Sequence, residues 1–166
     1  EKQPQIVAQI GEYLIKNNLP ISIDMYGEPN ENFNTSFLLL LPPNVTYYGP
    51  FNGFFSLPLY KYDAFLYTSI FDGMPNVILE AAQVGLPLVS SAVGGVPEFM
   101  QDNKNGLLVN DIRNPRAYVD ALTKLLDVGI REKLAFNAHK KLTEDFSPEH
   151  YAAAIKDMLK QLGYTI

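Results

Sequence analysis

The sequence contains no cysteine and no long run of apolar or basic residues, and each absence excludes a class of protein. Without cysteine there are no disulfides, no thiolate chemistry and no cysteine-bound metal, so a reducing compartment, the cytoplasm, is the default expectation. No apolar stretch approaches the roughly 20 residues that span a bilayer, and residues 37–41 are too few even for a signal-peptide core. At most two Lys or Arg residues stand together and the net charge is −5, so we expect no nucleic-acid partner.

The side chains that carry metal-dependent or hydrolytic chemistry are also scarce. There is no Asp-x-Asp pair and no cluster of His, Asp or Glu with metal-ligand spacing. The two histidines, His139 and His150, lie on predicted surface helices and are interpreted as solvated. No serine stands in a Gly-x-Ser-x-Gly turn, which leaves serine hydrolase chemistry without support. We therefore predict that the protein needs no metal and no cofactor.

The composition favours a single folded domain. A chain of 166 residues fits one domain, and a chain of this size can bury roughly 70% of the surface that its unfolded form exposes. Hydrophobic residues make up 47% and charged residues 19%, with ten Tyr and ten Phe. Disordered chains have the opposite composition, so we expect a packed core.

Short apolar segments that alternate with helical periodicity predict an α/β fold. The apolar spacing of residues 6–14 predicts a first helix, and a second helix is expected to run to Leu41, where two prolines stop it. Two C-terminal helices are expected behind the cap-and-proline pairs 114–115 and 147–148. Strands are predicted at residues 21–26, 45–48, 64–68, 86–90 and 107–110. This alternation predicts a Rossmann-like parallel sheet with helices on both faces and a ligand site at the carboxyl ends of the strands.

Residues 68–82 carry the most information about chemistry, because they lie directly after a predicted strand and open a predicted helix. Pro75 suits the first helical turn, which leaves the main-chain N–H groups of Asn76 and Val77 without helical partners at the sheet's carboxyl edge. The helix dipole favours an anion at that position. The segment therefore predicts a seat for a phosphate group.

Two carboxylates flank this seat. Glu80 stands four positions after Asn76, hence on the same helical face and about 6 Å further along the axis. Asp72 lies in the loop before the helix, where Gly73 allows close approach. A ligand with phosphate in the middle and hydroxyl groups at both ends, a nucleoside diphosphate sugar, would fit. In the alternative interpretation Asp72 only caps the loop and Glu80 is a solvated helix residue.

Four glycines are expected at further turns of the chain. Gly85 and Gly106 each precede a predicted strand and are expected at the exits of helices. Gly94 and Gly95 are expected to shape the loop beside the site. These positions suit a conformation that other residues rarely adopt.

The segment from Asp72 to Glu80, with Gly-Met-Pro-Asn-Val between them, resembles the Glu-x7-Glu signature of glycosyltransferase family 4. The family's usual form reads Glu-Gly-Phe-Pro-Asn-Val-x-x-Glu-Ala. Residues 87–98 and 105–109 resemble the next two strand-loop units of that family, in the same order and at the same spacing. The resemblance covers essentially the whole chain, and it implies one lobe of the two-lobe GT-B architecture.

The resemblance also implies roles for individual residues. Asp72 would hold the hydroxyl groups of the donor sugar, Glu80 would hold the ribose, and Lys2, in Glu-Lys-Gln-Pro, would bind the diphosphate. The main chain around the helix start would serve the sugar and the diphosphate, through residues Gly73, Met74, Pro75, Asn76 and Val77. Contacts near the base are implied for Gly27, Tyr48 and Gly49.

For several of these residues an alternative stays open at this point. Lys2 can equally be a frayed terminal residue, and Gly27 and Gly49 can be plain turn glycines. Asp72 is shorter by one methylene than the usual Glu, which leaves its contact with the sugar open.

As a whole, the resemblance implies a retaining, metal-independent glycosyltransferase that moves a sugar from a nucleoside diphosphate sugar to a glycan or lipid-linked acceptor, as in polysaccharide biosynthesis. Residues 1–166 are then expected to be a donor-binding domain fragment that lacks its first strand and the N-terminal acceptor-binding domain. Alone it is expected to be inactive. The parent enzyme is expected in the cytoplasm, with peripheral association at the inner membrane face as a further expectation.

Two other classes compete with this interpretation. A receiver-like sensing domain shares the alternation of strands and helices, but it needs an acidic cluster after its first strand, where this chain has only Glu28. A non-catalytic or degenerate nucleotide-binding lobe is compatible with Asp at position 72. Nucleotide binding separates these alternatives.

Overall fold

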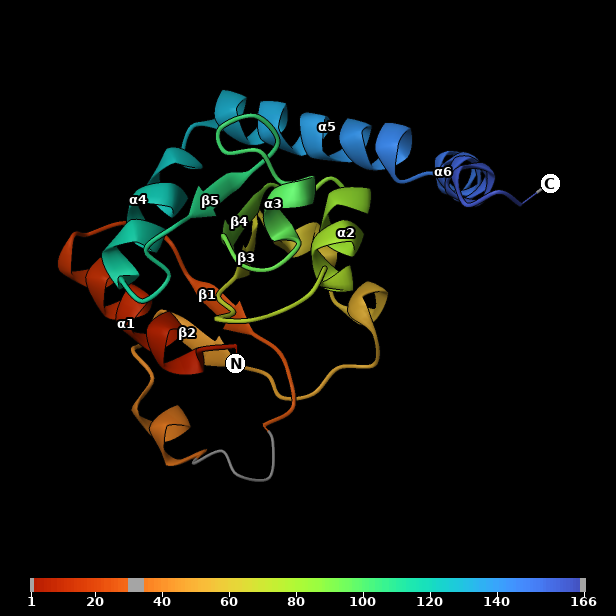
Figure 1. Ribbon diagram of the computed structural model, residues 1–166. Coiled ribbons are helices and arrows are strands. Elements are labelled where there is room, and N and C mark those ends of the chain that lie inside the picture. The colour runs from red at the N-terminus through yellow and green to blue at the C-terminus, as the bar shows by residue number, and fades with distance from the viewer. Residues whose placement is uncertain (1, 30–34, 165–166) are drawn as a thin grey trace.

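The computed structural model describes residues 2–29 and 35–164, in which helices and strands alternate along the chain (Figure 1). The strands are β1 (Ile23–Met25), β2 (Val45–Tyr47), β3 (Phe65–Tyr67), β4 (Leu88–Ser91) and β5 (Leu107–Val109). The α-helices are α1 (Pro4–Lys16), α2 (Asn76–Gln83), α3 (Val96–Phe99), α4 (Pro115–Lys124), α5 (Val128–Asp145) and α6 (Pro148–Gln161). Short 3₁₀ helices are η1 (Thr35–Leu40), η2 (Phe54–Ser56) and η3 (Leu59–Lys61).

All strand pairs are parallel, which confirms the predicted Rossmann-like α/β fold. Strands β1 and β2 form one sheet, with Ile23 opposite Val45. Strands β3, β4 and β5 form a second sheet in that order. The sequence analysis did not anticipate this division into two hydrogen-bonded sheets. Each predicted strand is present with different bounds: four are shorter than predicted, and the strand predicted at residues 86–90 lies at Leu88–Ser91.

Both faces of the β3–β4–β5 sheet are buried, and its side chains alternate between two cores. Val89 packs with α1 and α4 on one face, whereas the preceding Leu88 packs with α2 and α3 on the other. Helix α5 contributes Leu134 to the first core and Ala138 to the second. Every residue of β4 is buried, which makes it the most protected strand of this sheet and a fixed support for the loops at its carboxyl end.

The prediction of a glycine at a helix exit is confirmed for Gly85 and is wrong for Gly106. Gly85 has φ +76° and ends α2, with its N–H bonded to Ala82 and the N–H of Leu86 bonded to Ala81. Gly106 stands seven positions after the end of α3, at the start of β5. A Cβ there would lie 3.2 Å from the Leu88 carbonyl oxygen and overlap the terminal methyl of Met100, so close packing favours glycine at this position.

The helix expected to end at Leu41 is a 3₁₀ helix instead, in the part of it that the structure describes. It ends at Leu40, because the prolines at 42–43 disfavour a helical residue before them. Leu39 and Leu40 are 87% and 82% exposed, so no buried apolar face stabilises a longer α-helix here.

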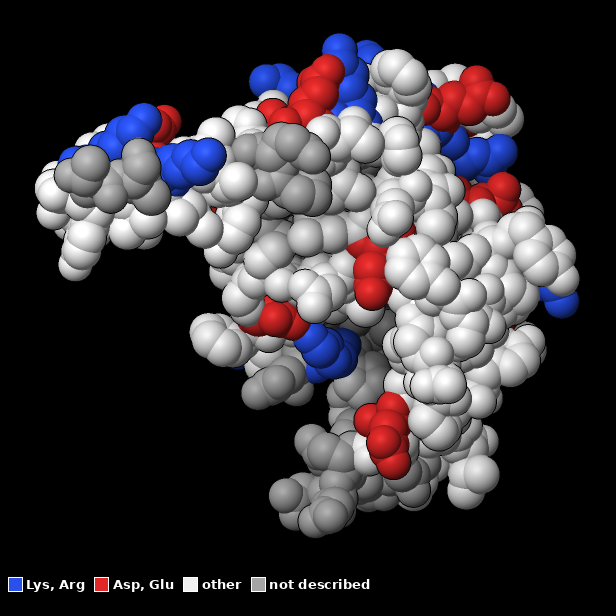
Figure 2. Space-filling view, turned by 90° about the vertical axis from the view of Figure 1, so that its right-hand side faces the viewer, with Lys and Arg blue, Asp and Glu red and all other residues white. Residues whose placement is uncertain are grey.

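The two C-terminal helices begin as predicted but differ in how they pack. Asn114 caps α4 at the N–H of Arg116, and Ser147 caps α6 at the N–H of His150. The apolar face of α4 is buried, whereas Tyr151 and Met158 of α6 and Leu162, which follows it, are more than half exposed. Full burial of such a side chain stabilises the folded state by roughly 1.5–3 kcal/mol. The exposed side chains of α6 do not provide this stabilisation. Accordingly, α6 projects from the body as an arm (Figures 1 and 2).

Candidate functional site

The loop between β3 and α2 lies at the carboxyl end of the most buried sheet. Helix α2 begins at Asn76, and Pro75 is its cap with ψ 120°, so Pro75 precedes the helix by one position and is not within its first turn. The Pro75 carbonyl accepts the N–H of Ile78 at 3.0 Å. Among the described residues, the main-chain N–H groups of Asn76 and Val77 have no hydrogen-bond partner. These two donors point out of the helix start, where the dipole favours an anion.

A second loop, after β4, holds this segment in place through its glycines. The N–H of Gly95 bonds to the carbonyl of Gly73 at 2.7 Å. Gly94 has φ +52°, and a Cβ at Gly94 would overlap the carbonyl oxygen of Asp72. The prediction that Gly94 and Gly95 shape the loop beside the site is therefore confirmed, and the reason is direct backbone contact with residues 72–73.

Three polar side chains meet in front of this loop. The Lys2 ammonium forms an ion pair with the Asp72 carboxylate. The hydroxyl of Tyr67, the last residue of β3, accepts a hydrogen bond from Lys2 and donates one to Asp72. Lys2 Nζ also lies 4.7 Å from the centroid of the Tyr67 ring. Lys2 and Asp72, which are 70 positions apart in sequence, are thus neighbours in the fold.

Sequence reasoning missed Tyr67. Its ring belongs to the core against α2, so an apolar role explains the residue without any reference to the site. The position of Tyr67 at the end of a strand could have indicated its role. The last residue of a strand lies at the carboxyl edge of a parallel sheet, where ligands bind.

Lys2 is held in place by the residues around it. Gln3 has φ 48° and donates its side-chain amide to the carbonyls of Thr68, at 3.0 Å, and Ile112, at 3.2 Å. The hydroxyl of Thr68 in turn donates to the Lys2 carbonyl at 2.8 Å. The alternative that Lys2 is a frayed terminal residue is therefore wrong for this structure. The beginning of the chain lies beside the end of β3 (Figure 1).

The charges of this cluster are mutually stabilising. Hydrogen bonds from Lys2 and then Tyr67 hold the pKa of Asp72 below its ordinary value. Burial lowers the pKa of Lys2, but its bonds to Asp72 and Tyr67 outweigh burial, and the net pKa is raised. Burial, followed by the bond to Asp72, raises the pKa of the Tyr67 phenol. At neutral pH the cluster therefore contains a carboxylate, an ammonium and a neutral phenol.

Replacing Lys2 with methionine is expected to raise the pKa of the Asp72 carboxyl toward its ordinary value. The Asp72 carboxylate stabilises the folded state above its unfolded pKa of about 3.9, and this contribution is lost as the pH falls through the lowered folded pKa. The pKa is measured by carbon-detected NMR titration, with the resonance assigned by Asp72→Asn. Lys16→Met, at the C-terminal end of α1, is the control. An unchanged Asp72 pKa in Lys2→Met would contradict the ion pair.

Glu80 stands on α2, one turn beyond the free N–H groups. It is partly buried, and no hydrogen bond or ion pair of its side chain to another described residue is formed. The rise from Asn76 to Glu80 is about 6 Å. The structure thus places Asp72 before the helix start and Glu80 beyond it, with the N–H groups of Asn76 and Val77 between them.

The residues implied near the base lie at the carboxyl ends of β1 and β2. The N–H of Gly27 bonds to the carbonyl of Gly49 at 2.9 Å, and both glycines have positive φ. Tyr48 is 57% exposed and stacks on Tyr26, with ring centroids 5.2 Å apart. The Tyr26 hydroxyl is fixed by Tyr62 at 2.6 Å. The edge therefore presents a supported aromatic ring that is open on one face.

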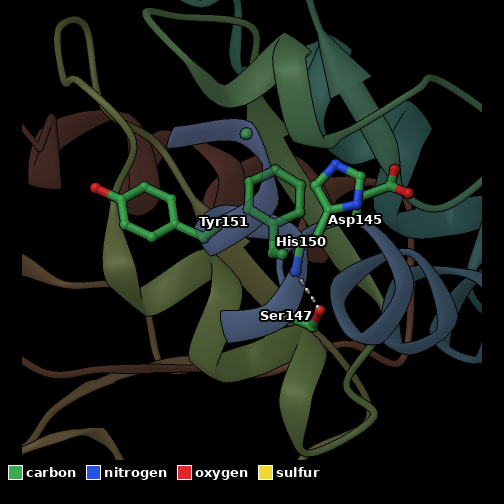
Figure 3. Close-up of a pocket in the computed structure, with 6 residues that line it drawn as sticks. Asp145, Ser147, His150 and Tyr151 are labelled. Carbon is green, nitrogen blue, oxygen red and sulfur yellow. Dashed lines mark hydrogen bonds between the residues drawn. The ribbon is translucent and has the colours of Figure 1, made fainter. Parts of the chain in front are cut away.

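One hollow that the structure describes lies away from these strand ends. A cavity of about 510 Å³ opens where α5 passes into α6 (Figure 3). Its lining consists of Asp145, Phe146, Ser147, His150, Tyr151 and Ala154. None of the predicted site residues is among them, and the lining is mostly apolar. The charged cluster at the strand ends, rather than this hollow, is the candidate site.

Neither a metal centre nor a basic surface stands out in the described part of the chain. Residues 2–29 and 35–164 hold no group of three or more His, Cys, Asp or Glu arranged to hold a metal ion. On the face drawn in Figure 2, Lys and Arg side chains are scattered and do not form a continuous basic surface. Within the same residues, no helix has both the length and the apolar character needed to cross a membrane.

Comparison with known proteins then identifies the family. The family profile described as "Glycosyl transferases group 1" matches residues 4–128, which include the strand ends, the loop and α2. The chain belongs to the group 1 glycosyltransferases. Lys2 precedes the matched range, whereas Asp72 and Glu80 lie within it.

Curated relatives of this glycosyltransferase chain are longer than the chain itself. UDP-Gal:alpha-D-GlcNAc-diphosphoundecaprenol alpha-1,3-galactosyltransferase from Escherichia coli is 26% identical over 176 residues, which cover 95% of this chain and 42% of that protein. Lipopolysaccharide core biosynthesis glycosyltransferase LpsE from Rhizobium meliloti is 37% identical over 101 residues, which cover 60% of this chain and 28% of that protein. The chain therefore spans less than half the length of these relatives.

Solved structures show the same fold. The C-terminal domain of the group 1 glycosyl transferase LpcC from Francisella tularensis has a TM-score of 0.73 at 20% identity, covering 89% of this chain and 80% of that one. The pneumococcal O-GlcNAc transferase GtfA, in complex with UDP and GlcNAc, has a TM-score of 0.72 at 19% identity. That match covers 99% of this chain and 34% of GtfA. At these identities the likeness concerns the fold.

Proposed function

We propose that the chain is the donor-binding domain of a retaining, metal-independent glycosyltransferase, which transfers a sugar from a nucleoside diphosphate sugar to a glycan or lipid-linked acceptor. One observation carries the proposal: the free N–H groups at the start of α2 lie between the Lys2–Asp72 pair and Glu80. An anion at the helix start, flanked by two groups that accept hydrogen bonds from hydroxyls, matches a diphosphate joined to two sugars.

Each part of the site has a role in this proposal. The N–H groups of Asn76 and Val77 and the Lys2 ammonium bind the diphosphate, Glu80 accepts from the ribose, and Asp72 accepts from the donor sugar. Bond cleavage at the anomeric carbon leaves negative charge on the departing diphosphate. Fixed donors aimed at that charge, here the ammonium and the helix start, would stabilise it without a metal ion. Gly73, Met74 and Pro75 form the backbone that brings these groups together.

Relatives guide the choice of donor and acceptor. The name of the Escherichia coli enzyme specifies a UDP-activated galactose and a lipid diphosphate acceptor. GtfA was crystallised with UDP and GlcNAc, and Anabaena HepE with UDP-glucose. UDP sugars are therefore the first donors to test. The exposed face of Tyr48 is proposed to stack on the base.

Binding of a nucleoside diphosphate in the absence of metal is expected, and Glu80→Ala is expected to weaken it about tenfold, or about 1.4 kcal/mol. The measurement is calorimetric titration with UDP, GDP and ADP and their sugar conjugates in the presence of a chelator. Glu132→Ala, an exposed carboxylate on α5, is the charge-matched control. Equal affinities of the two variants, or no binding of any nucleotide, would contradict the proposal.

We further propose that the acceptor binds to a domain outside residues 1–166, and that this chain alone does not transfer sugar. The length of the relatives supports this proposal, because this chain covers 42% of one of them and 28% of the other. Strands β1–β2 and β3–β4–β5 form two separate hydrogen-bonded sheets, and we propose that a strand from outside these residues joins them. If a longer protein that contains this chain bound the donor but transferred no sugar, that result would favour the alternative interpretation, a degenerate lobe. Asp at position 72 is compatible with this alternative.

A further inference from the structure

The proposed function leaves one member of the charged cluster without a role. Tyr67 is 6% exposed, and its ring packs against Phe65 with centroids 6.5 Å apart. Its hydroxyl accepts a hydrogen bond from Lys2 and donates one to Asp72, and its ring lies 4.7 Å from Lys2 Nζ. A core tyrosine whose single polar atom contacts both proposed donor-binding charges is placed to control their arrangement.

We propose that Tyr67 is a positioning residue, which fixes the Asp72 carboxylate relative to the Lys2 ammonium and thereby sets the affinity for the sugar end of the donor. This inference rests on the proposed function. It assigns Tyr67 no contact with the reacting atoms, since it acts through Asp72 and Lys2.

The direction of both hydrogen bonds follows from the charges. The raised pKa of the Tyr67 phenol keeps its proton in place at neutral pH, so the O–H donates to the carboxylate and a lone pair accepts from the ammonium. Each bond involves an ionised partner, and such bonds are shorter and stronger than neutral ones. The hydroxyl therefore orients both charges at once.

The ion pair alone would orient these charges poorly. The Lys2 and Asp72 side chains are 58% and 26% exposed, and pairs between exposed charges hold long side chains weakly. Residues Gly94 and Gly95 fix the Asp72 main chain but bring no side chain to the carboxylate. Among the described residues, Lys2 and Tyr67 are the titratable groups that contact Asp72. Of these, only Tyr67 is anchored in the core.

Tyr67→Phe removes the hydroxyl and retains the ring, so the fold is expected to persist. We expect the affinity for the UDP, GDP or ADP sugar bound by the unmodified chain to fall about tenfold, with less than a threefold change for the bare diphosphate. Because Asp72 loses a donor, the acid limb of sugar-conjugate binding is expected to move to higher pH. Tyr60→Phe, which alters an 87% exposed ring, is the matched control and leaves both affinities unchanged.

A double-mutant cycle separates positioning from a structural role. In an Asp72→Asn background, Tyr67→Phe is expected to change sugar-conjugate affinity less than twofold, because its effect passes through the carboxylate. An unaltered affinity in Tyr67→Phe, an equal loss for conjugate and bare diphosphate, or full additivity with Asp72→Asn would overturn the proposal. If the unmodified chain bound no nucleotide at all, the proposed function itself would fail, and the role of Tyr67 with it.

Discussion

Alanine at position 94 is expected to lower the free energy of unfolding by about 3–5 kcal/mol, a loss at the upper end for single substitutions. Gly94 has φ +52°, and the added Cβ would come far closer than 3.0 Å to the Asp72 carbonyl oxygen. Backbone cannot rotate away as a side chain can, so the two loops must separate. Urea unfolding followed by circular dichroism measures the loss, and nucleotide titration is expected to show that binding is lost as well.

Gly85→Ala is the matched control for this prediction. Gly85 also has positive φ, at +76°, but a Cβ there would meet no atom within 4 Å. Left-handed strain alone costs about 1 kcal/mol. The difference between the two variants therefore isolates the contact between the loops. Equal losses would mean that strain, rather than the contact with Asp72, explains the glycine at position 94.

Asp72→Asn is expected to change the preference of the site between a nucleoside diphosphate and its sugar conjugate. Loss of the carboxylate removes charge-assisted bonds to sugar hydroxyls, so we expect about a hundredfold weaker binding of the conjugate. The bare diphosphate is expected to bind about threefold tighter. Lys2 then has no competing carboxylate, and a negative charge beside the anion site is removed. Calorimetric titration with both ligands in parallel measures the two changes.

Asp120→Asn, on the exposed surface of α4, is the control for the change of charge and is expected to alter neither affinity. Parallel weakening of both ligands in Asp72→Asn would contradict the assignment of Asp72 to the sugar. It would indicate instead that Asp72 serves mainly to hold Lys2 in place.

The sequence predicts those parts of the fold that depend on neighbouring residues. The caps Asn114 and Ser147 and the exit glycine Gly85 act within a turn of their helices, and the structure confirms them. The strands are found because each is a short apolar run. Residues 72–80 fold as a loop and helix for the same local reasons, which is why the phosphate seat could be proposed from the sequence.

Features that depend on distant residues could not be predicted in this way. Tyr67 meets Lys2 across 65 positions, and its own neighbours explain it equally well as a core residue. Gly106 resembles a helix exit, yet the preference for a small residue there comes from Leu88 and Met100, which are distant in sequence or outside its own turn. Helix α5 buries only Leu134 and Ala138, so its apolar periodicity was too weak to indicate its bounds.

The hydrogen bonds of Gln3 bear on how the protein acquires its site. They join the start of the chain to carbonyls 65 and 109 positions later, and closing loops of that length costs entropy before any contact compensates for it. We therefore expect Lys2 to reach Tyr67 and Asp72 after the β3–β4–β5 sheet and the segment before α4 have folded. The site is then expected to form late in folding, and a ligand that needs Lys2 is expected to stabilise the fully folded chain rather than a partly folded intermediate.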